Sequence, residues 1–122
     1  MKTVLLADDE AHLRLLVHTA LEAAAYRILE AADGPQALAL ARVEHPDLLV
    51  LDWMMPGLSG LVVAQMLRRD PATADIPIIM LTARGQALDR ALGHAVGLQA
   101  YLLKPFSPLA LLEKVQAILQ VP

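Results

Sequence analysis

The sequence predicts an α/β fold, namely a doubly wound, five-stranded parallel sheet with helices on both faces. Five short aliphatic runs alternate with longer amphipathic stretches along the 122 residues, and this alternation is typical of repeated strand–helix units. The third run, Leu48–Asp52, is aliphatic up to its final carboxylate, as expected for a strand that is buried on both faces. Five strands are too few for an eightfold barrel, so we expect an open sheet with strand order 2-1-3-4-5.

The expected strands are short aliphatic runs, of which the second is the weakest. They are expected at about residues 4–7, 26–30, 48–52, 76–82 and 100–103. The third is separated from the preceding helix by His45-Pro46-Asp47, because a residue that precedes proline disfavours the helical conformation.

Each expected helix has a one-sided apolar pattern or a start or stop signal. Helices are expected at about residues 10–25, 35–44, 60–70, 86–96 and 107–120. In the first, apolar residues recur at steps of three and four, which buries one stripe. Pro35 suits the first turn of the second helix, Ser59 is placed to cap the third, and Gly97 ends the fourth.

Composition and charge exclude several functional classes. Hydrophobic residues make up 57% of the chain and aromatic residues only 3%, so the core is expected to be aliphatic. The net charge of −3 argues against a nucleic-acid-binding surface, which would carry clustered Lys and Arg. The chain has no cysteine, and its apolar runs are too short to cross a bilayer. We expect one cytoplasmic domain over residues 1–122, without an output domain and without direct contact to nucleic acid or membrane.

Polar residues follow the ends of four expected strands. They are Asp8 and Asp9 after the first, Asp52 at the end of the third, Thr82 at the end of the fourth and Lys104 after the fifth. In an open α/β sheet these ends meet in one crevice. Carboxylates without Cys or His nearby suit Mg²⁺, with Mn²⁺ as a substitute, while a hydroxyl and an ammonium suit phosphoryl oxygens. The pattern favours transfer of a phosphoryl group to a carboxylate, which forms an aspartyl-phosphate.

Each of these signals also has an ordinary structural interpretation. A single Asp at a strand end is more often a cap or a turn residue, and acids at residues 8–10 also suit a helix N-terminus, where they complement the macrodipole. Lys104 before a proline carries little information alone. Four strands that all end in groups able to serve one ion are harder to explain by capping, so the functional interpretation is favoured.

Four segments of the sequence resemble response-regulator receiver domains of the chemotaxis-regulator type, whose fold is flavodoxin-like, (βα)₅. The segments are residues 7–10, 51–57, 81–84 and 101–106, which read ADDE, LDWMMPG, LTAR and YLLKPF. They occur in the family's order and at its separations, and the resemblance covers the whole chain. It implies two-component signalling, in which a phosphohistidine of a sensor histidine kinase or a phosphotransfer protein phosphorylates Asp52.

The resemblance also implies how the metal is held. Asp9, Asp52 and the backbone carbonyl of Met54 would ligand Mg²⁺ directly, and Asp8 would act largely through water.

The same resemblance implies the roles of the remaining site residues. Lys104 would pair with the phosphoryl group, next to a cis peptide bond to Pro105. Thr82 and Tyr101 would form the switch, in which the hydroxyl moves toward the phosphate and the ring swings inward. Phosphorylation adds about −1.5 to −2 charge and three acceptor oxygens, and so biases a two-state equilibrium. Such a domain promotes its own phosphorylation and dephosphorylation but is a switch rather than an enzyme with turnover.

One face of the domain departs from the family's pattern. Members that bind DNA dimerise through charges on the fourth helix, fifth strand and fifth helix. Arg90, Glu113 and Lys114 are kept, but the acidic partners expected in residues 97–100 are missing. We therefore doubt a charged homodimer and expect contact with a downstream protein, or with the chain's own output domain if the chain is a fragment. Four residues are expected either to form an exposed apolar surface for such contacts or to be surplus core. They are Leu98, Leu109, Val62 and Val63.

The residues two positions after Asp52 and Thr82 bear on the lifetime of the phosphoryl group. They are Met54 and Arg84, and in the family these positions control access of water. An apolar Met and a long Arg would shield the acyl-phosphate, so we expect slow self-dephosphorylation. The four histidines, His12, His18, His45 and His94, are scattered along the chain and are interpreted as surface or partly buried residues.

Three other functions compete with a phosphorylatable switch. A Mg²⁺-dependent phosphohydrolase of the haloacid-dehalogenase type would need a second acid where Met54 stands, and a cap domain. A flavodoxin-like nucleotide binder would need a phosphate-cradling loop after the first strand, where residues 8–10 are acidic. A receiver that acts as a scaffold without phosphorylation is disfavoured by the complete site.

Overall fold

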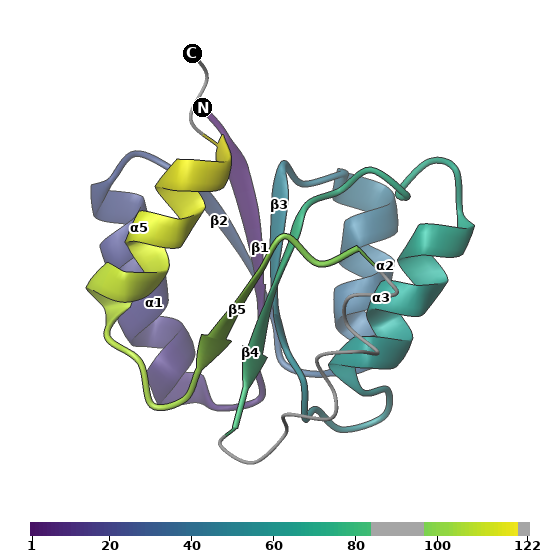
Figure 1. Cartoon of the computed structure of the whole chain (residues 1–122), viewed down its shortest axis with the longest axis horizontal. Helices are drawn as coiled ribbons and strands as arrows, with labels where there is room; N and C mark the ends of the chain where they lie inside the picture. Colours follow the sequence, from purple (N-terminus) through teal and green to yellow (C-terminus); the bar gives the residue numbers. More distant parts are fainter. Residues whose placement is uncertain (84–96, 120–122) are drawn as a thin grey trace.

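The structure is a five-stranded parallel sheet with helices on both faces (Figure 1). The computed structural model describes residues 1–83 and 97–119, and the helix predicted at residues 86–96 lies outside these ranges. The strand order is β2-β1-β3-β4-β5, which confirms the predicted fold class and strand order. The strands are β1 Thr3–Ala7, β2 Arg27–Ala31, β3 Leu48–Asp52, β4 Ile78–Thr82 and β5 Ala100–Leu103. The helices are α1 Ala11–Ala23, α2 Gly34–Glu44, α3 Gly60–Arg69 and α5 Pro108–Leu119.

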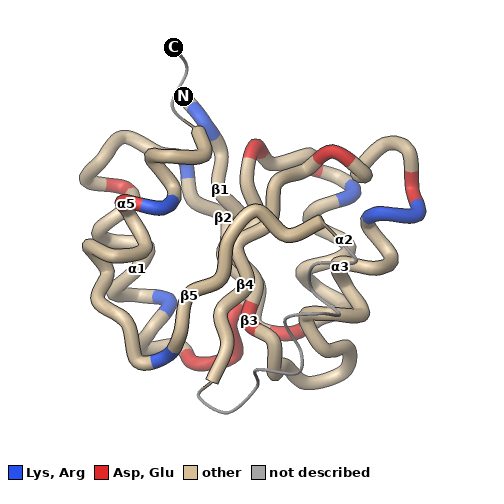
Figure 2. Tube along the Cα trace, viewed as in Figure 1, with Lys and Arg blue, Asp and Glu red and all other residues tan. Residues whose placement is uncertain are grey.

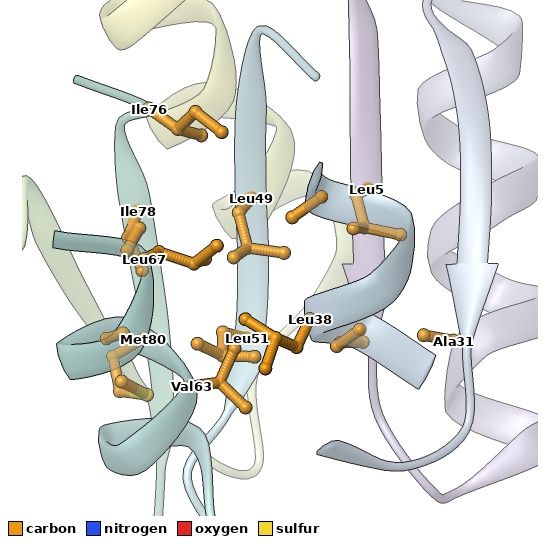
Figure 3. Close-up of a cluster of buried hydrophobic side chains, with 14 of the residues drawn as sticks. Leu5, Ala31, Leu38, Leu49, Leu51, Val63, Leu67, Ile76, Ile78 and Met80 are labelled. Atoms are coloured by element: carbon orange, nitrogen blue, oxygen red, sulfur yellow. The ribbon is translucent and has the colours of Figure 1, made fainter. Parts of the chain in front are cut away.

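The sheet separates two aliphatic cores. Helices α1 and α5 cover one face, and α2 and α3 cover the other (Figure 1). Because side chains alternate along a strand, Leu49 and Met80 pack in the cluster under α2 and α3 (Figure 3), while Val50 and Ile79 pack in the opposite cluster. All residues of β3 and β4 are buried, and burying one such side chain contributes about 1.5–3 kcal/mol. These central strands therefore form a rigid base for the residues at their carboxyl ends.

Local capping signals begin two helices as predicted. The Asp33 side chain accepts a hydrogen bond from the Gln36 amide at 2.8 Å, and Pro35 lies in the first turn of α2. The Ser59 hydroxyl accepts from the Val62 amide at 3.3 Å at the start of α3. Each satisfies a backbone donor that the first turn leaves without a partner.

In the described ranges, no helix is long and apolar enough to cross a membrane.

Two strands begin later than predicted, for reasons of backbone hydrogen bonding. The Tyr26 amide donates to the Leu21 carbonyl of α1, so β2 begins at Arg27 rather than at residue 26. The Ile76 amide is bonded within the preceding turn, and Pro77 has no N–H to donate. Strand β4 therefore begins at residue 78 rather than 76.

The first helix is shorter than predicted at both ends. Glu10 has an extended backbone and is the N-cap, so α1 begins at Ala11. After Ala23 the chain turns, and Ala25 adopts a left-handed conformation with φ of 69°. This conformation ends a helix.

Val63 belongs to the core, which is one of the two alternatives that the sequence left open for it. Val63 is fully buried in the cluster under α2 and α3, because it lies three residues after Gly60 and four before Leu67 on the inward stripe of α3. Leu98 is partly buried against the same cluster. Leu109 is 61% exposed, so for this residue the exposed alternative holds.

Candidate functional site

The polar residues that follow the strands lie at one edge of the sheet. Asp8 and Asp9 follow β1, Asp52 ends β3, Thr82 ends β4 and Lys104 follows β5. Carboxylate oxygens of the three Asp residues lie within 4.8 Å of one another. Figure 2 shows acidic segments at this edge, at the lower side of the view. The parallel topology thus brings together residues that are up to 96 positions apart in the chain.

Asp8 is the most firmly held member of the group. It is fully buried, and its amide donates to the Ala31 carbonyl of the neighbouring β2 at 3.1 Å. Its Oδ1 accepts from the Glu10 amide at 2.9 Å, and its Oδ2 accepts from Lys104 Nζ at 2.8 Å. Both carboxylate oxygens therefore have donors, which a buried carboxylate requires.

Lys104 links the two buried carboxylates. Its Nζ lies 2.8 Å from Asp8 Oδ2 and 3.2 Å from Asp52 Oδ2. Burial lowers the pKa of the Lys104 ammonium, but the hydrogen bond to Asp8 and the charges of Asp52 and Asp8 outweigh burial, so the pKa is raised. The Lys104–Pro105 peptide bond is cis, the geometry that the resemblance implies. The Lys104 amide donates to the Thr82 carbonyl at 2.7 Å, which ties the lysine to the end of β4.

Asp52 is buried beside charges of both signs. Only 5% of the residue is exposed. Burial and the negative charge of Asp8 raise the pKa of Asp52 to about 6, against the opposing effects of Lys104 and of the Met54 amide. That amide lies 3.4 Å from Asp52 Oδ1. A further cation would therefore stabilise the ionised form of Asp52.

A close helix start supports the end of β3. The Gly60 amide, at the first residue of α3, donates to the Trp53 carbonyl at 2.8 Å. A Cβ atom at Gly60 would lie 2.3 Å from the carbonyl oxygen of Asp52. Only glycine allows this approach.

Asp9 differs from the other two acids. Its side chain is exposed, and it has no hydrogen-bond or ion-pair partner in the described part of the chain. Three carboxylates that converge, one of them free to bind, match the hard oxygen ligands that Mg²⁺ prefers. The donor set therefore fits a magnesium site formed by Asp8, Asp9 and Asp52.

The two proposed switch residues lie on neighbouring strands. Thr82 is 7% exposed at the end of β4. Tyr101 pairs with Met80 in the β4–β5 register and packs, partly buried, against the cluster under α2 and α3. Of the two residues expected to shield the acyl-phosphate, Arg84 lies outside the described residues. Met54 is 63% exposed and lies in the loop two residues after Asp52.

Sequence reasoning missed one residue that reaches this site. Arg14 of α1 donates from Nη1 to the backbone carbonyl of Asp8 at 2.6 Å. The available signal was a basic residue one turn after the helix start, on the side that faces the sheet edge.

A pocket of about 270 Å³ opens beside the site, and its lining residues are Glu10, Leu13, Lys104, Pro105 and Phe106.

Comparison with known proteins identifies one family over most of the chain. The family model described as "Response regulator receiver domain" matches residues 4–116. The phosphate regulon transcriptional regulatory protein PhoB of Pseudomonas aeruginosa is 48% identical over 119 residues, which are 98% of this chain and 52% of that protein. The chain spans about half the length of the curated relatives it matches.

Solved structures agree with the fold. The chemotaxis response regulator CheY4 of Vibrio cholerae has a TM-score of 0.91 at 35% identity, with 98% of this chain and 99% of that chain covered. The receiver domain of sensor histidine kinase PA1611 from Pseudomonas aeruginosa has a TM-score of 0.85 at 29% identity, with 95% of each chain covered. That structure is described as having a magnesium ion coordinated in the active site cleft.

Proposed function

Because the chain belongs to the response regulator receiver domain family of two-component signalling, we propose that it is a phosphoacceptor switch whose acceptor is Asp52. The observation that carries this proposal is the buried ion-paired group at the sheet edge, in which Lys104 Nζ lies between Asp8 and Asp52. A structural carboxylate at a strand end would not need a buried acid and a partly buried lysine beside it.

The proposed step is a displacement at phosphorus. A carboxylate oxygen of Asp52 attacks the phosphorus of a phosphohistidine on a sensor kinase or phosphotransfer protein. The new O–P bond forms as the P–N bond breaks. The electron pair of the P–N bond stays on the ring nitrogen, so a ring already protonated on its other nitrogen leaves as neutral imidazole. Lys104 would neutralise the phosphoryl oxygens, and the Thr82 hydroxyl would donate to one of them.

A divalent cation belongs to this proposal. Asp9 and Asp52, with the Met54 carbonyl, would hold Mg²⁺, and Asp8 would act largely through water; Mn²⁺ could substitute. When bound, the ion supplies positive charge that offsets the carboxylates and the phosphoryl oxygens. The magnesium described for the related PA1611 receiver domain supports this assignment.

The output of the switch would pass through Thr82 and Tyr101. Thr82 gains an acceptor when Asp52 is phosphorylated, and movement of its loop changes the space available to the partly buried Tyr101 ring. The affected surface includes β5 and α5. We propose that this surface contacts a downstream protein or an output domain of a longer chain, as the transcriptional regulators among the relatives suggest.

The proposal does not include catalytic turnover. A phosphohydrolase would need a second acid two residues after Asp52, and this position is Met54 in the exposed loop. Binding to nucleic acid is not proposed either, because no basic cluster is expected in residues 1–122. The charged homodimer remains doubtful, because strand β5 reads Ala100-Tyr101-Leu102-Leu103 and carries no acid.

The experiment is intact mass spectrometry after incubation with acetyl phosphate or phosphoramidate. We expect one added phosphoryl group that requires Mg²⁺ and is lost in Asp52→Asn. The matched control is Asp75→Asn, an exposed acid before the opposite end of β4, which should be phosphorylated like the wild type. No adduct with intact Mg²⁺ binding would instead favour the scaffold function.

A further inference from the structure

We propose that Arg14 is a positioning residue for the Asp8–Asp9 pair, and that Glu30 and His18 hold Arg14 in the required orientation. The inference rests on the proposed function, because it concerns the residues that would hold Mg²⁺. None of these three residues belongs to the predicted metal-binding group of Asp8, Asp9 and Asp52.

The contact between Arg14 and Asp8 fixes a peptide plane. Arg14 Nη1 donates to the Asp8 carbonyl oxygen at 2.6 Å. That carbonyl belongs to the planar peptide unit that joins Asp8 to Asp9. Holding its oxygen therefore sets the direction in which Asp9 leaves the strand. Since the Asp9 carboxylate has no partner among the described residues, the backbone is what orients it toward Asp52.

Arg14 is itself held by a carboxylate on β2. Its Nε lies 3.0 Å from Glu30 Oε1, and only 17% of the Arg14 side chain is exposed. A guanidinium is a planar fork, so a hydrogen bond at Nε determines where Nη1 points. Glu30 thus aims the donor that reaches Asp8.

Glu30 is fixed in turn by a histidine one helical turn after Arg14. His18 Nδ1 lies 2.6 Å from Glu30 Oε2, and His18 Nε2 lies 3.2 Å from Glu22 Oε2. The Glu30 carboxylate therefore uses one oxygen for Arg14 and the other for His18. The result is a continuous series of contacts from Glu22 to the backbone of Asp8, which lies at the buried end of the series.

The sign of the effect separates positioning from electrostatics. Arg14 carries a positive charge close to the carboxylates, so its removal should tighten binding of a cation if charge alone matters. If Arg14 positions Asp9, its removal should weaken binding. A purely structural role would lower the melting temperature without changing the Mg²⁺ affinity of the folded protein.

The test is a Mg²⁺ titration of the full chain followed by fluorescence of Trp53, the single tryptophan, which adjoins Asp52. We expect Arg14→Gln to raise the Mg²⁺ dissociation constant about 10-fold, as for residues that orient metal ligands. Arg14→Lys keeps the charge but loses the fork, and should not restore the affinity. Arg27→Gln is the control, since Arg27 pairs with Glu44 at 3.8 Å at the other end of β2.

A double-mutant cycle shows whether the effect passes through Asp9. In an Asp9→Asn background, Arg14→Gln should change the Mg²⁺ affinity by less than about 2-fold. If Arg14→Gln fails to fold, Arg14→Lys serves in its place: it keeps the positive charge, so weaker Mg²⁺ binding in that variant cannot come from charge alone. Tighter or unchanged binding in these variants, or equal weakening in both backgrounds, would overturn the inference. If the wild type binds no Mg²⁺, the proposed function fails instead.

Discussion

The Nζ atom of Lys104 lies 3.2 Å from Oδ2 of Asp52, so the ends of β5 and β3 are joined by an ion pair. The pair does not offset the whole cost of burying Asp52, because the pKa of this carboxyl is still raised to about 6 by burial and by Asp8. Burial and Asp8 therefore disfavour the ionised form of Asp52, even with Lys104 beside it.

We expect Asp52→Asn to stabilise the metal-free protein at pH 7.5. The pKa of Asp52 rises from 3.8 to about 6 on folding, so the folded state holds the proton more tightly and stability falls as pH rises between these values. Removing the charge should raise the free energy of unfolding by about 1–3 kcal/mol, with a smaller gain near pH 4. Urea unfolding in EDTA measures this, with Asp75→Asn as control. A loss of stability at pH 7.5 would contradict the electrostatic account.

Removal of the lysine should have the opposite effect. Lys104→Met leaves Asp8 and Asp52 without their shared donor, and an unsatisfied buried group costs about 1–3 kcal/mol. The loss should shrink at pH 5, where Asp52 becomes protonated. Urea midpoints at pH 7.5 and pH 5 measure the difference, and the exposed Lys2→Met serves as control. Equal stability of wild type and Lys104→Met at both pH values would count against the ion pair.

Gly60 should tolerate no side chain. In Gly60→Ala the added Cβ would lie 2.3 Å from the Asp52 carbonyl oxygen, so α3 or the end of β3 must move. We expect a loss of about 1–3 kcal/mol together with reduced phosphorylation of Asp52. Ser59→Ala, which removes only the neighbouring cap, should cost about 1 kcal/mol and leave phosphorylation unchanged. If both variants retain full phosphorylation, Gly60 has no role in placing Asp52.

His18 should make stability depend on pH. Burial lowers the pKa of His18, but hydrogen bonds and charges of Glu30 and Glu22 outweigh burial, so the pKa lies above 6.5 in the folded protein. The stabilisation is then fully present below pH 6.5 and is lost as pH rises through the raised pKa.

The test compares urea unfolding of wild type and His18→Gln at pH 5.5 and pH 8.5. We expect the variant to be less stable mainly at pH 5.5, and the matched control is His12→Gln at an exposed histidine of the same helix. A difference that is larger at pH 8.5 would show that His18 acts as a neutral group.

The sequence predicts most of the fold because the aliphatic runs have clear ends. The bounds of β3 match the prediction, since His45 and Pro46 end the preceding helix and Asp52 ends the strand. The start of β2 does not match, because the Tyr26 amide bonds to α1, and such a tertiary hydrogen bond leaves no local pattern. The sequence left Val63 open between surface and core because the phase of α3 was not applied to it.

The candidate site was predictable in its residues but not in its energetics. Strand ends alone bring Asp8, Asp52 and Lys104 together, because the topology places all carboxyl ends at one edge. The raised pKa of Asp52 depends on burial, and the Arg14 contact depends on the phase of α1 against the loop before it. Neither the raised pKa of Asp52 nor the Arg14 contact can be predicted from residue types alone.

The most direct test of the account is to locate the phosphoryl group. An acyl-phosphate is reduced by borohydride, and reduction of a phosphorylated Asp gives homoserine. After incubation with acetyl phosphate and Mg²⁺, peptide mass spectrometry should find homoserine at position 52 and nowhere else. Homoserine at position 8 or 9, or no reduced residue in protein that binds Mg²⁺, would contradict the assignment of Asp52 as the phosphoacceptor.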